Sequence, residues 1–305
     1  MTSAASAAGP ARGCSQHLRR SRRGNRGWAL GLALIAPAFF LMVCLIFAPA
    51  ALSVAGTFFP TGSAGASLAN YERFFGDQLS VLNLVFTIWT TLATLVVLLI
   101  IGLVIAVYLR FSQSRLVAAI QMLSLFPLFV PGIVISFGLI RFLGPTGLVP
   151  TVLKAIGITG YQTPYLHPSG AVIGLVWENI PLTVMLLTAG LSQVSNRAIE
   201  AARDVGANAA QVFAYIVLPT LARSIAVVCC LNFLQIFGSF TVPYILGPAA
   251  PQMMSIFMQR TFSELRLAGA AETEAAVTFL VCLVAGVIYT AIVFRDSATK
   301  GTLAA

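Results

Sequence analysis

The sequence predicts an all-α integral membrane protein with six transmembrane helices. Of its 305 residues, 58% are hydrophobic and only 9% are charged, and the mean hydropathy is +0.93. A soluble domain carries about 25% charged residues, so this chain has too little polar surface to cover a water-exposed core. A bilayer crossing needs about 20 apolar residues. Six runs are long enough: roughly Trp28–Phe59, Asn83–Leu109, Leu116–Leu143, Ser169–Leu191, Ser224–Leu246 and Ala275–Phe294.

The basic residues indicate how the chain is oriented. Six arginines lie in the first 27 residues, directly before the first apolar run. Positively charged segments stay on the cytoplasmic side, so we expect a cytoplasmic basic tail and both termini inside. The net charge of +9 therefore indicates membrane topology and not nucleic-acid binding. The first apolar run exceeds the 7–15 residues of a signal-peptide core, so we expect an uncleaved first helix.

A charged amphipathic segment, Glu200–Pro219, separates the fourth and fifth apolar runs. We expect Asn196 to cap its first helix, Gly206 to divide it into two short helices, and Pro219 to begin a new helix. Its orientation places it in the cytoplasm. An amphipathic loop lying on the bilayer is the alternative. The apolar residues that recur at helical spacing, and are expected to be buried, are Ile199, Ala202, Val205, Ala209, Val212 or Phe213, and Ile216.

The spacing in this segment resembles the EAA motif of ABC importer permeases. The matching positions are Glu200-Ala201-Ala202, then after three residues Gly206, after nine more Ile216, and after one more Leu218-Pro219. The resemblance implies a type I ABC importer permease (MetI-like) fold, in which this loop forms a coupling helix that docks into a groove on a cytoplasmic ATPase. It implies ATPase-coupling roles for Glu200, Ala201, Ala202, Asp204, Gly206, Leu218 and Pro219.

The resemblance extends over nearly the whole chain from about residue 28. Residues 237–247, Phe-Gly-Ser-Phe-Thr-Val-Pro-Tyr-Ile-Leu-Gly, are similar to the segment found in permeases for polyamines, ferric iron and related small solutes. Sugar permeases tend to carry a Trp-Asn pair there, which this chain lacks. The implied organisation is a basic tail over residues 1–27 and a permease domain over residues 28–305. Its core spans about 83–294, and its cytoplasmic coupling loop spans 196–222.

The resemblance implies a multi-pass permease subunit in the inner or plasma membrane of a prokaryote, working by alternating access. The expected partners are a cytoplasmic ATPase dimer, a second permease subunit (a copy or a different chain), an extracytoplasmic solute-binding protein and the lipid bilayer. A sugar or glycerol-phosphate permease is the alternative within this class. An ion-driven secondary transporter would need intramembrane carboxylates in matched halves, and the chain has one clear intramembrane acid and no visible repeat.

We expect no catalytic, cofactor or metal site in this chain. A phosphate-binding loop needs Gly-Lys-Ser/Thr, and neither Lys154 nor Lys300 follows a glycine. ATP is therefore expected to bind partner subunits. His17 and His167 fall on opposite sides of the predicted membrane, and the five cysteines show no zinc spacing. A membrane-embedded enzyme or scaffold would need a reactive cluster or a partner-binding domain, which the sequence lacks.

Polar residues within the predicted spans are candidates for a translocation path. Glu178 is the clear intramembrane acid, and its burial in a bilayer is costly. We consider two roles for it: contact with a cationic group of the solute, or pairing within the complex. Polar residues at i, i+3 and i+7 in the fifth span are expected on one helical face, where they line the path or join helices. The candidate path residues are Glu178, Asn179, Asn232, Gln235 and Ser239.

Overall fold

The computed structural model describes residues 34–59 and 65–302, which contain helices and no strand. The basic tail and the start of the first apolar run lie outside the described residues. The chain forms two units, residues 1–56 and 57–305. The described part of the first predicted span is one apolar helix over Leu34–Thr57, which includes a π-helical turn η1 (Val43–Phe47) and α2 (Ala48–Thr57). This confirms the first span over its described residues.

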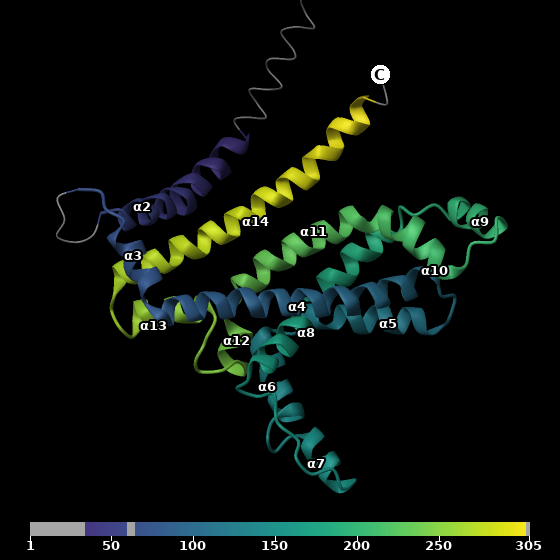
Figure 1. Ribbon diagram of the computed structural model, residues 1–305, viewed down its shortest axis with the longest axis horizontal. Helices are drawn as coiled ribbons and strands as arrows, with labels where there is room; N and C mark the ends of the chain where they lie inside the picture. Colours follow the sequence, from purple (N-terminus) through teal and green to yellow (C-terminus); the bar gives the residue numbers. More distant parts are fainter. Residues whose placement is uncertain (1–33, 60–64, 303–305) are drawn as a thin grey trace, which may run out of the picture. The chain divides into compact units, whose positions relative to one another are not determined.

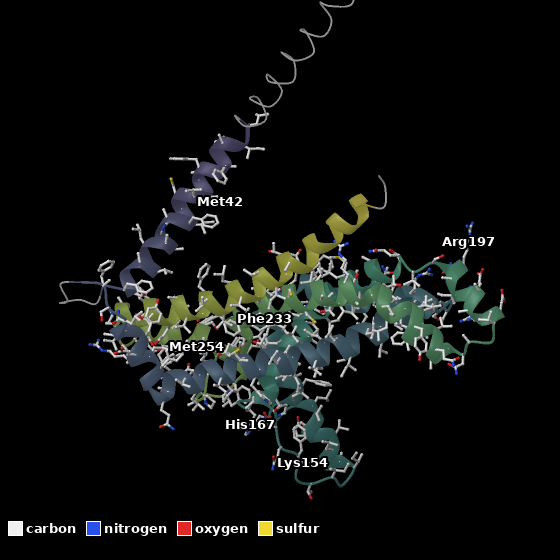
Figure 2. The ribbon with its side chains drawn as sticks, turned by 45° about the horizontal axis from the view of Figure 1, so that its top comes forward. Met42, Lys154, His167, Arg197, Phe233 and Met254 are labelled. Atoms are coloured by element: carbon white, nitrogen blue, oxygen red, sulfur yellow. The ribbon has the colours of Figure 1, made fainter. Side chains whose placement is uncertain are left out.

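The second unit is a bundle of long helices with short helices at its two ends (Figure 1). The helix α4 packs along α8, and α11 packs against α4, α8 and α14. Short helices α9 and α10 lie at the opposite end of the bundle from α3 and α13, as Arg197 and Met254 show in Figure 2. The elements are α3 (Ala69–Gly76), α4 (Gln78–Phe111), α5 (Leu116–Leu125), η2 (Phe126–Phe129), α6 (Gly132–Leu143), α7 (Leu148–Ala155), α8 (Pro168–Leu191), α9 (Asn196–Asp204), α10 (Ala209–Val212), η3 (Phe213–Val217), α11 (Leu218–Phe237), α12 (Thr241–Leu246), α13 (Met254–Ser263) and α14 (Ala268–Thr302).

Six helical segments in the described chain are long and apolar enough to cross a membrane. The second, fourth and sixth predicted spans correspond to α4, α8 and α14, and their existence is confirmed. The third predicted span, Leu116–Leu143, is interrupted, as its residues Pro127 and Pro131 indicate. Its first part, Leu116–Phe129, is a shorter apolar helix, and the segment long enough to span is Gly132–Ala155.

Proline explains the break in the third span. Pro131 has no N–H group and restricts the residue before it, so Val130 is extended, with φ −108° and ψ 120°. The chain therefore leaves the 3₁₀ turn η2 and starts again as α6 at Gly132.

The predicted fifth span, Ser224–Leu246, is wrong at both ends. One helix runs from Ala209 to Phe237, and a break then precedes α12. Pro243 cannot donate a helical hydrogen bond to the carbonyl of Ser239, which lies four residues earlier. The Ser255 Oγ–H donates to that carbonyl instead, at 2.6 Å. The break is therefore satisfied by a side chain from α13.

Glycines allow the central helices to approach closely. A Cβ atom added to Gly102 on α4 would lie 2.5 Å from Thr183 Cγ2 on α8. A Cβ atom added to Gly190 on α8 would lie 2.3 Å from the Ser224 hydroxyl on α11. Small residues at such crossings let helix backbones pack tightly inside a membrane. The bundle core is thus organised around α8.

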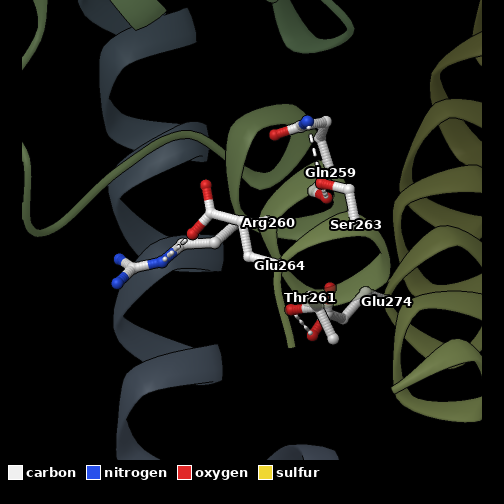
Figure 3. A network of polar contacts seen from close by, with 6 residues as sticks. All are labelled: Gln259, Arg260, Thr261, Ser263, Glu264 and Glu274. Atoms are coloured by element: carbon white, nitrogen blue, oxygen red, sulfur yellow. Dashed lines mark hydrogen bonds and ion pairs between the residues drawn. The ribbon is translucent and has the colours of Figure 1, made fainter. Parts of the chain in front are cut away.

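Helix α13 is tied to α14 by a buried polar contact (Figure 3). The Thr261 hydroxyl donates to Glu274 Oε1 at 3.0 Å, and both side chains are buried. The exposed face of α13 carries an Arg260–Glu264 ion pair at 3.2 Å. The buried pair is the contact expected to matter for stability, because exposed ion pairs contribute little.

We expect Thr261→Val to destabilise the end of the bundle that contains α3 and α13. Losing the hydroxyl leaves a buried carboxyl oxygen without its donor, at a cost of about 1–3 kcal/mol. The midpoint of thermal unfolding in detergent should fall. The matched control is Thr290→Val, because the exposed Thr290 hydroxyl donates only to its own helix, at the Gly286 carbonyl. Equal midpoints for the two variants would contradict a stabilising role for the Thr261–Glu274 contact.

Candidate coupling site and translocation path

The coupling loop folds as two short helices joined by a turn, as predicted. Helix α9 ends at Asp204, and Gly206 follows with φ +88°, which favours glycine. The Gly206 N–H donates to the Arg203 carbonyl at 2.9 Å, and the Ala207 N–H donates to the Ala202 carbonyl at 3.0 Å. These two bonds form a Schellman motif, which satisfies the last carbonyls of α9. The turn is therefore a defined structure.

The predicted cap at Asn196 is wrong, because the N-cap of α9 is Ser195, which makes no side-chain cap hydrogen bond. Asn196 is the first residue of α9, and its Oδ1 accepts a hydrogen bond from Arg110 Nη2 at 2.7 Å, which joins α9 to the end of α4. The second helix, α10, is capped by Asn208, whose Oδ1 accepts from the Gln211 N–H at 2.9 Å. The Gln211 side chain accepts from the Asn208 N–H at 2.8 Å. This capping box has a sequence signature, Asn-x-x-Gln, which the sequence analysis missed.

Pro219 does not restart the helix, contrary to expectation. The π-helical turn η3 leads from α10 into α11, and the Leu218 N–H donates to the Phe213 carbonyl. Pro219 is the second residue of α11 and cannot donate to the carbonyl four residues earlier. The wider turn before it accommodates this missing bond. A single helix of 29 residues therefore connects the coupling loop to the bundle interior.

An apolar core fixes the coupling loop to the bundle. Ile199 of α9, Val212 of α10 and Val217 of η3 are buried in one cluster with side chains from α4, α8 and α11. The predicted buried face is confirmed for these helices, with Ala202, Phe213 and Ile216 half-buried beside the core. The bundle side chains in this cluster are Ala106, Leu187, Leu191, Leu221 and Val228.

Two residues of the predicted apolar face are exposed instead. Val205 is 86% exposed, and Ala209 is also exposed. Helix α9 ends before Val205, so the turn carries this side chain outward. Tyr215 is 79% exposed on η3. Large exposed apolar side chains near a charged surface are typical of a protein interface.

The predicted coupling residues lie mainly on the outside of the loop. Ala202 is half-buried toward the core, and Gly206 forms the turn. The exposed members are Glu200, Ala201, Asp204, Leu218 and Pro219. The loop therefore presents one charged and apolar face outward while its other face is buried in the bundle.

The five candidate path residues do not form one surface. Asn232 is fully buried, and its Nδ2 donates to Thr183 Oγ1 on α8 at 3.1 Å and to the Val228 carbonyl at 2.9 Å. Gln235 is exposed, and Ser239 lies beyond the end of α11. The expected shared helical face is wrong because α11 ends at Phe237. Asn232 joins α11 to α8 in this structure.

The α8 candidates have different surroundings. Asn179 is buried, and its Nδ2 donates to the Leu175 carbonyl at 2.8 Å. Glu178 is half-buried near the middle of α8. Its Oε1 lies 3.0 Å from the position that a Cβ atom on Gly132 would take. Among the residues that the structure describes, no group donates a hydrogen bond to Glu178 or pairs with its charge.

A buried polar face on α4 was missed by the sequence analysis. Its members recur at helical spacing, which is the signal that was available. Asn83 Oδ1 accepts from the Gln252 N–H at 2.9 Å, and Thr87 Oγ1 accepts from the Met254 N–H at 2.8 Å. These bonds hold the start of α13. The fully buried polar residues of this face are Asn83, Thr87, Thr90, Thr91 and Thr94.

No metal centre is formed by the described residues, which contain no group of three His, Cys, Asp or Glu side chains able to hold an ion. The free cysteines that the structure describes are Cys44, Cys229, Cys230 and Cys282.

Comparison with known proteins assigns the family. Residues 98–296, about two thirds of the chain, match the family described as binding-protein-dependent transport system inner membrane component. The chain belongs to this family. Its match covers α8, the coupling loop and α11, and the family description places its members in the inner membrane.

Relatives of this permease include polyamine transport proteins. The spermidine/putrescine transport system permease protein PotB of Haemophilus influenzae is 30% identical over 188 residues, which are 60% of this chain and 64% of that protein. PotB of Escherichia coli is 27% identical over 234 residues, or 74% of this chain and 84% of that protein.

The fold matches a solved importer structure. The crystal structure of a bacterial ABC transporter involved in the import of the acidic polysaccharide alginate aligns with a TM-score of 0.70 over 92% of this chain and 98% of that chain. The sequence identity is 16%, so this likeness shows the fold alone. The expected type I ABC importer permease fold is confirmed.

We expect Gly206→Ala to loosen the coupling loop of this permease without crowding it. No atom lies within 4 Å of the added methyl group, so the cost is the positive φ, about 1–2 kcal/mol. Amide hydrogen exchange over residues 203–211 should accelerate about tenfold if that cost favours local opening. Gly157→Ala is the control, because Gly157 also has a positive φ (+82°) and open space, but lies after α7. If both variants changed hydrogen exchange in the coupling loop by the same factor, the role of Gly206 in holding its turn would be refuted.

Proposed function

We propose that this chain is the membrane-spanning permease subunit of an ABC importer that couples ATP hydrolysis to solute uptake. The observation that carries the proposal is the coupling loop itself. Its inner face is buried against α4, α8 and α11, while its outer face presents Val205, Glu200 and Asp204. A solvent-exposed loop serving only as a connection would not need a Schellman turn, a capping box and a shared core.

The proposed partner at this face is a cytoplasmic ATPase dimer. In this proposal ATP binds those subunits. When the ATPases close, they move α9 and α10, and the buried core passes that movement to the ends of three long helices. A short element that is held on both sides transmits force without deforming. Both chain termini lie on the same cytoplasmic side in this proposal, in agreement with the basic tail.

The opposite end of the bundle is the proposed docking side for a solute-binding protein. It contains α3, α13 and the loops beside them (Figure 1). A second permease subunit, either a copy or a different chain, completes a cavity between the two. The solute enters that cavity from outside and leaves inward after the helices change orientation.

The proposed cargo is a small solute such as a polyamine or ferric iron. The PotB relatives, named for spermidine and putrescine transport, support the polyamine over a sugar or glycerol-phosphate. The alginate importer does not favour the sugar alternative, because a likeness at 16% sequence identity shows the fold and not the solute.

We expect Val205→Asp to detach the ATPase. Docking would bury an unpaired carboxylate in place of an apolar side chain, which costs several kcal/mol, so recovery of the ATPase with the tagged chain should fall about tenfold or more. The measurement is mass spectrometry of the complex purified in mild detergent. Ile158→Asp is the control, because Ile158 is also an exposed apolar residue but lies between α7 and α8, away from the coupling loop. An ATPase that never accompanies the wild-type chain, even after gentle crosslinking, would overturn the proposed function.

A further inference from the structure

Glu178 lies where three elements of the bundle meet. A Cβ atom on Gly132, the first residue of α6, would lie 3.0 Å from Glu178 Oε1 and 3.5 Å from Val242 Cγ2. Val242 is the second residue of α12. The third and fifth spans are both broken by proline and both start again here. Broken helices inside a membrane are tolerated where the backbone is buried in protein or lines a cavity.

The absence of a side chain at Gly132 makes room for the carboxyl group. Any larger residue there would contact Oε1 at a distance tighter than ordinary packing. The first N–H groups of α6 have no partner within the helix, because its bonds begin with Val134 and Ile135, which donate to the Pro131 carbonyl. Gly132 therefore lies on the N-terminal turn of α6, beside the carboxyl group of Glu178.

A carboxylate within a span is costly, and Glu178 has no cationic partner among the described residues. It is also half-buried, so part of it is accessible. Asn179, next in sequence, is buried and bonded to its own helix, and Asn232 is bonded to Thr183. Glu178 is thus the candidate path residue whose side chain is ionisable and only half-buried.

We propose that the Glu178 carboxylate is a transient binding site for an ammonium group of the transported solute. This inference rests on the proposed function, and it narrows the cargo to organic amines. An oxyanion would be repelled by the unpaired carboxylate, and a neutral sugar would gain nothing from its charge. Ferric iron needs several ligands, and the described residues provide no group of three acidic, histidine or cysteine side chains around it. An ammonium group is satisfied by one carboxylate and by carbonyl oxygens, because it only donates hydrogen bonds.

The test uses the complete importer in proteoliposomes, with radiolabelled spermidine as the probe. Glu178→Gln keeps the size and removes the charge, so spermidine uptake should fall about tenfold or more. Glu178→Asp keeps the charge on a shorter side chain and should retain more uptake than the glutamine variant. Lys154→Gln removes a charge from an exposed side chain of α7, outside the coupling loop and the proposed docking side, and should transport at the wild-type rate. Uptake by Glu178→Gln equal to that of Lys154→Gln overturns the proposal.

Gly132→Ala gives an independent variant at the same place. Its methyl group crowds Oε1 of Glu178 and leaves the carboxylate in the protein. We expect spermidine uptake to fall while the charge of the chain is unchanged. Gly138→Ala, on the same helix with open space around its Cβ position, is the matched control. Equal uptake by the two alanine variants contradicts a site beside Gly132.

A measurement on the wild-type importer tests the same site without any substitution, so its result does not depend on whether the variants fold. Dicyclohexylcarbodiimide reacts with carboxyl groups inside membranes, and mass spectrometry locates the modified residue. Spermidine should protect Glu178 from modification, whereas sucrose and molybdate should not. If Glu178 is modified to the same extent with and without spermidine, the proposed amine site is wrong. The proposed function is tested separately, because the ATPase still co-purifies with the chain if only the amine inference is wrong.

Discussion

The coupling loop depends on a buried apolar core that it shares with three long helices. Ile199, Val212 and Val217 enter the cluster from the loop side, and Leu187 and Leu191 enter from α8. Burial of each such side chain contributes about 1.5–3 kcal/mol. An exposed hydrogen bond such as that between Arg110 and Asn196 contributes about 0.5–1.5 kcal/mol. Hydrogen bonds of this kind alone would not hold the loop in one position against the bundle. We therefore expect the loop and the end of the bundle to move as one body.

The long helix from Ala209 to Phe237 carries that connection into the membrane. Its π-helical turn accommodates Pro219 without a break, so a displacement at α10 reaches the far end of α11. The fifth span starts again as α12, and Val242 of α12 lies beside Gly132 and the carboxyl group of Glu178. Glu178, which we propose contacts the solute, lies near the middle of α8, and α8 shares the buried core with the loop at its other end. This arrangement links the ATPase contact to the solute path through a small number of rigid elements.

The sequence predicted the features that depend on local chemistry. Apolar length identified α4, α8 and α14, and glycine at position 206 identified the turn. Features that depend on tertiary partners were missed. Pro243 indicates an interruption of the fifth span, but neither the position of the α11 end at Phe237 nor the hydrogen bond from the Ser255 hydroxyl to the Ser239 carbonyl could be predicted. The face predicted from residues 232, 235 and 239 failed for that reason. Glu178 on α8 and Gly132 on α6 are more than 40 positions apart in the chain, and no periodicity within either helix indicates that they lie side by side.

We expect the loop and the helices beneath it to move together during transport. Double electron–electron resonance between spin labels at Arg203→Cys on α9 and Phe111→Cys at the end of α4 measures this directly, in a chain whose native cysteines are replaced. Both positions are exposed, so the labels leave the core intact. We predict one distance distribution in the assembled importer that is the same without nucleotide and with ATP bound. A distribution that shifts or splits on ATP binding, while solute is still transported, would show that the loop moves independently and would contradict the account.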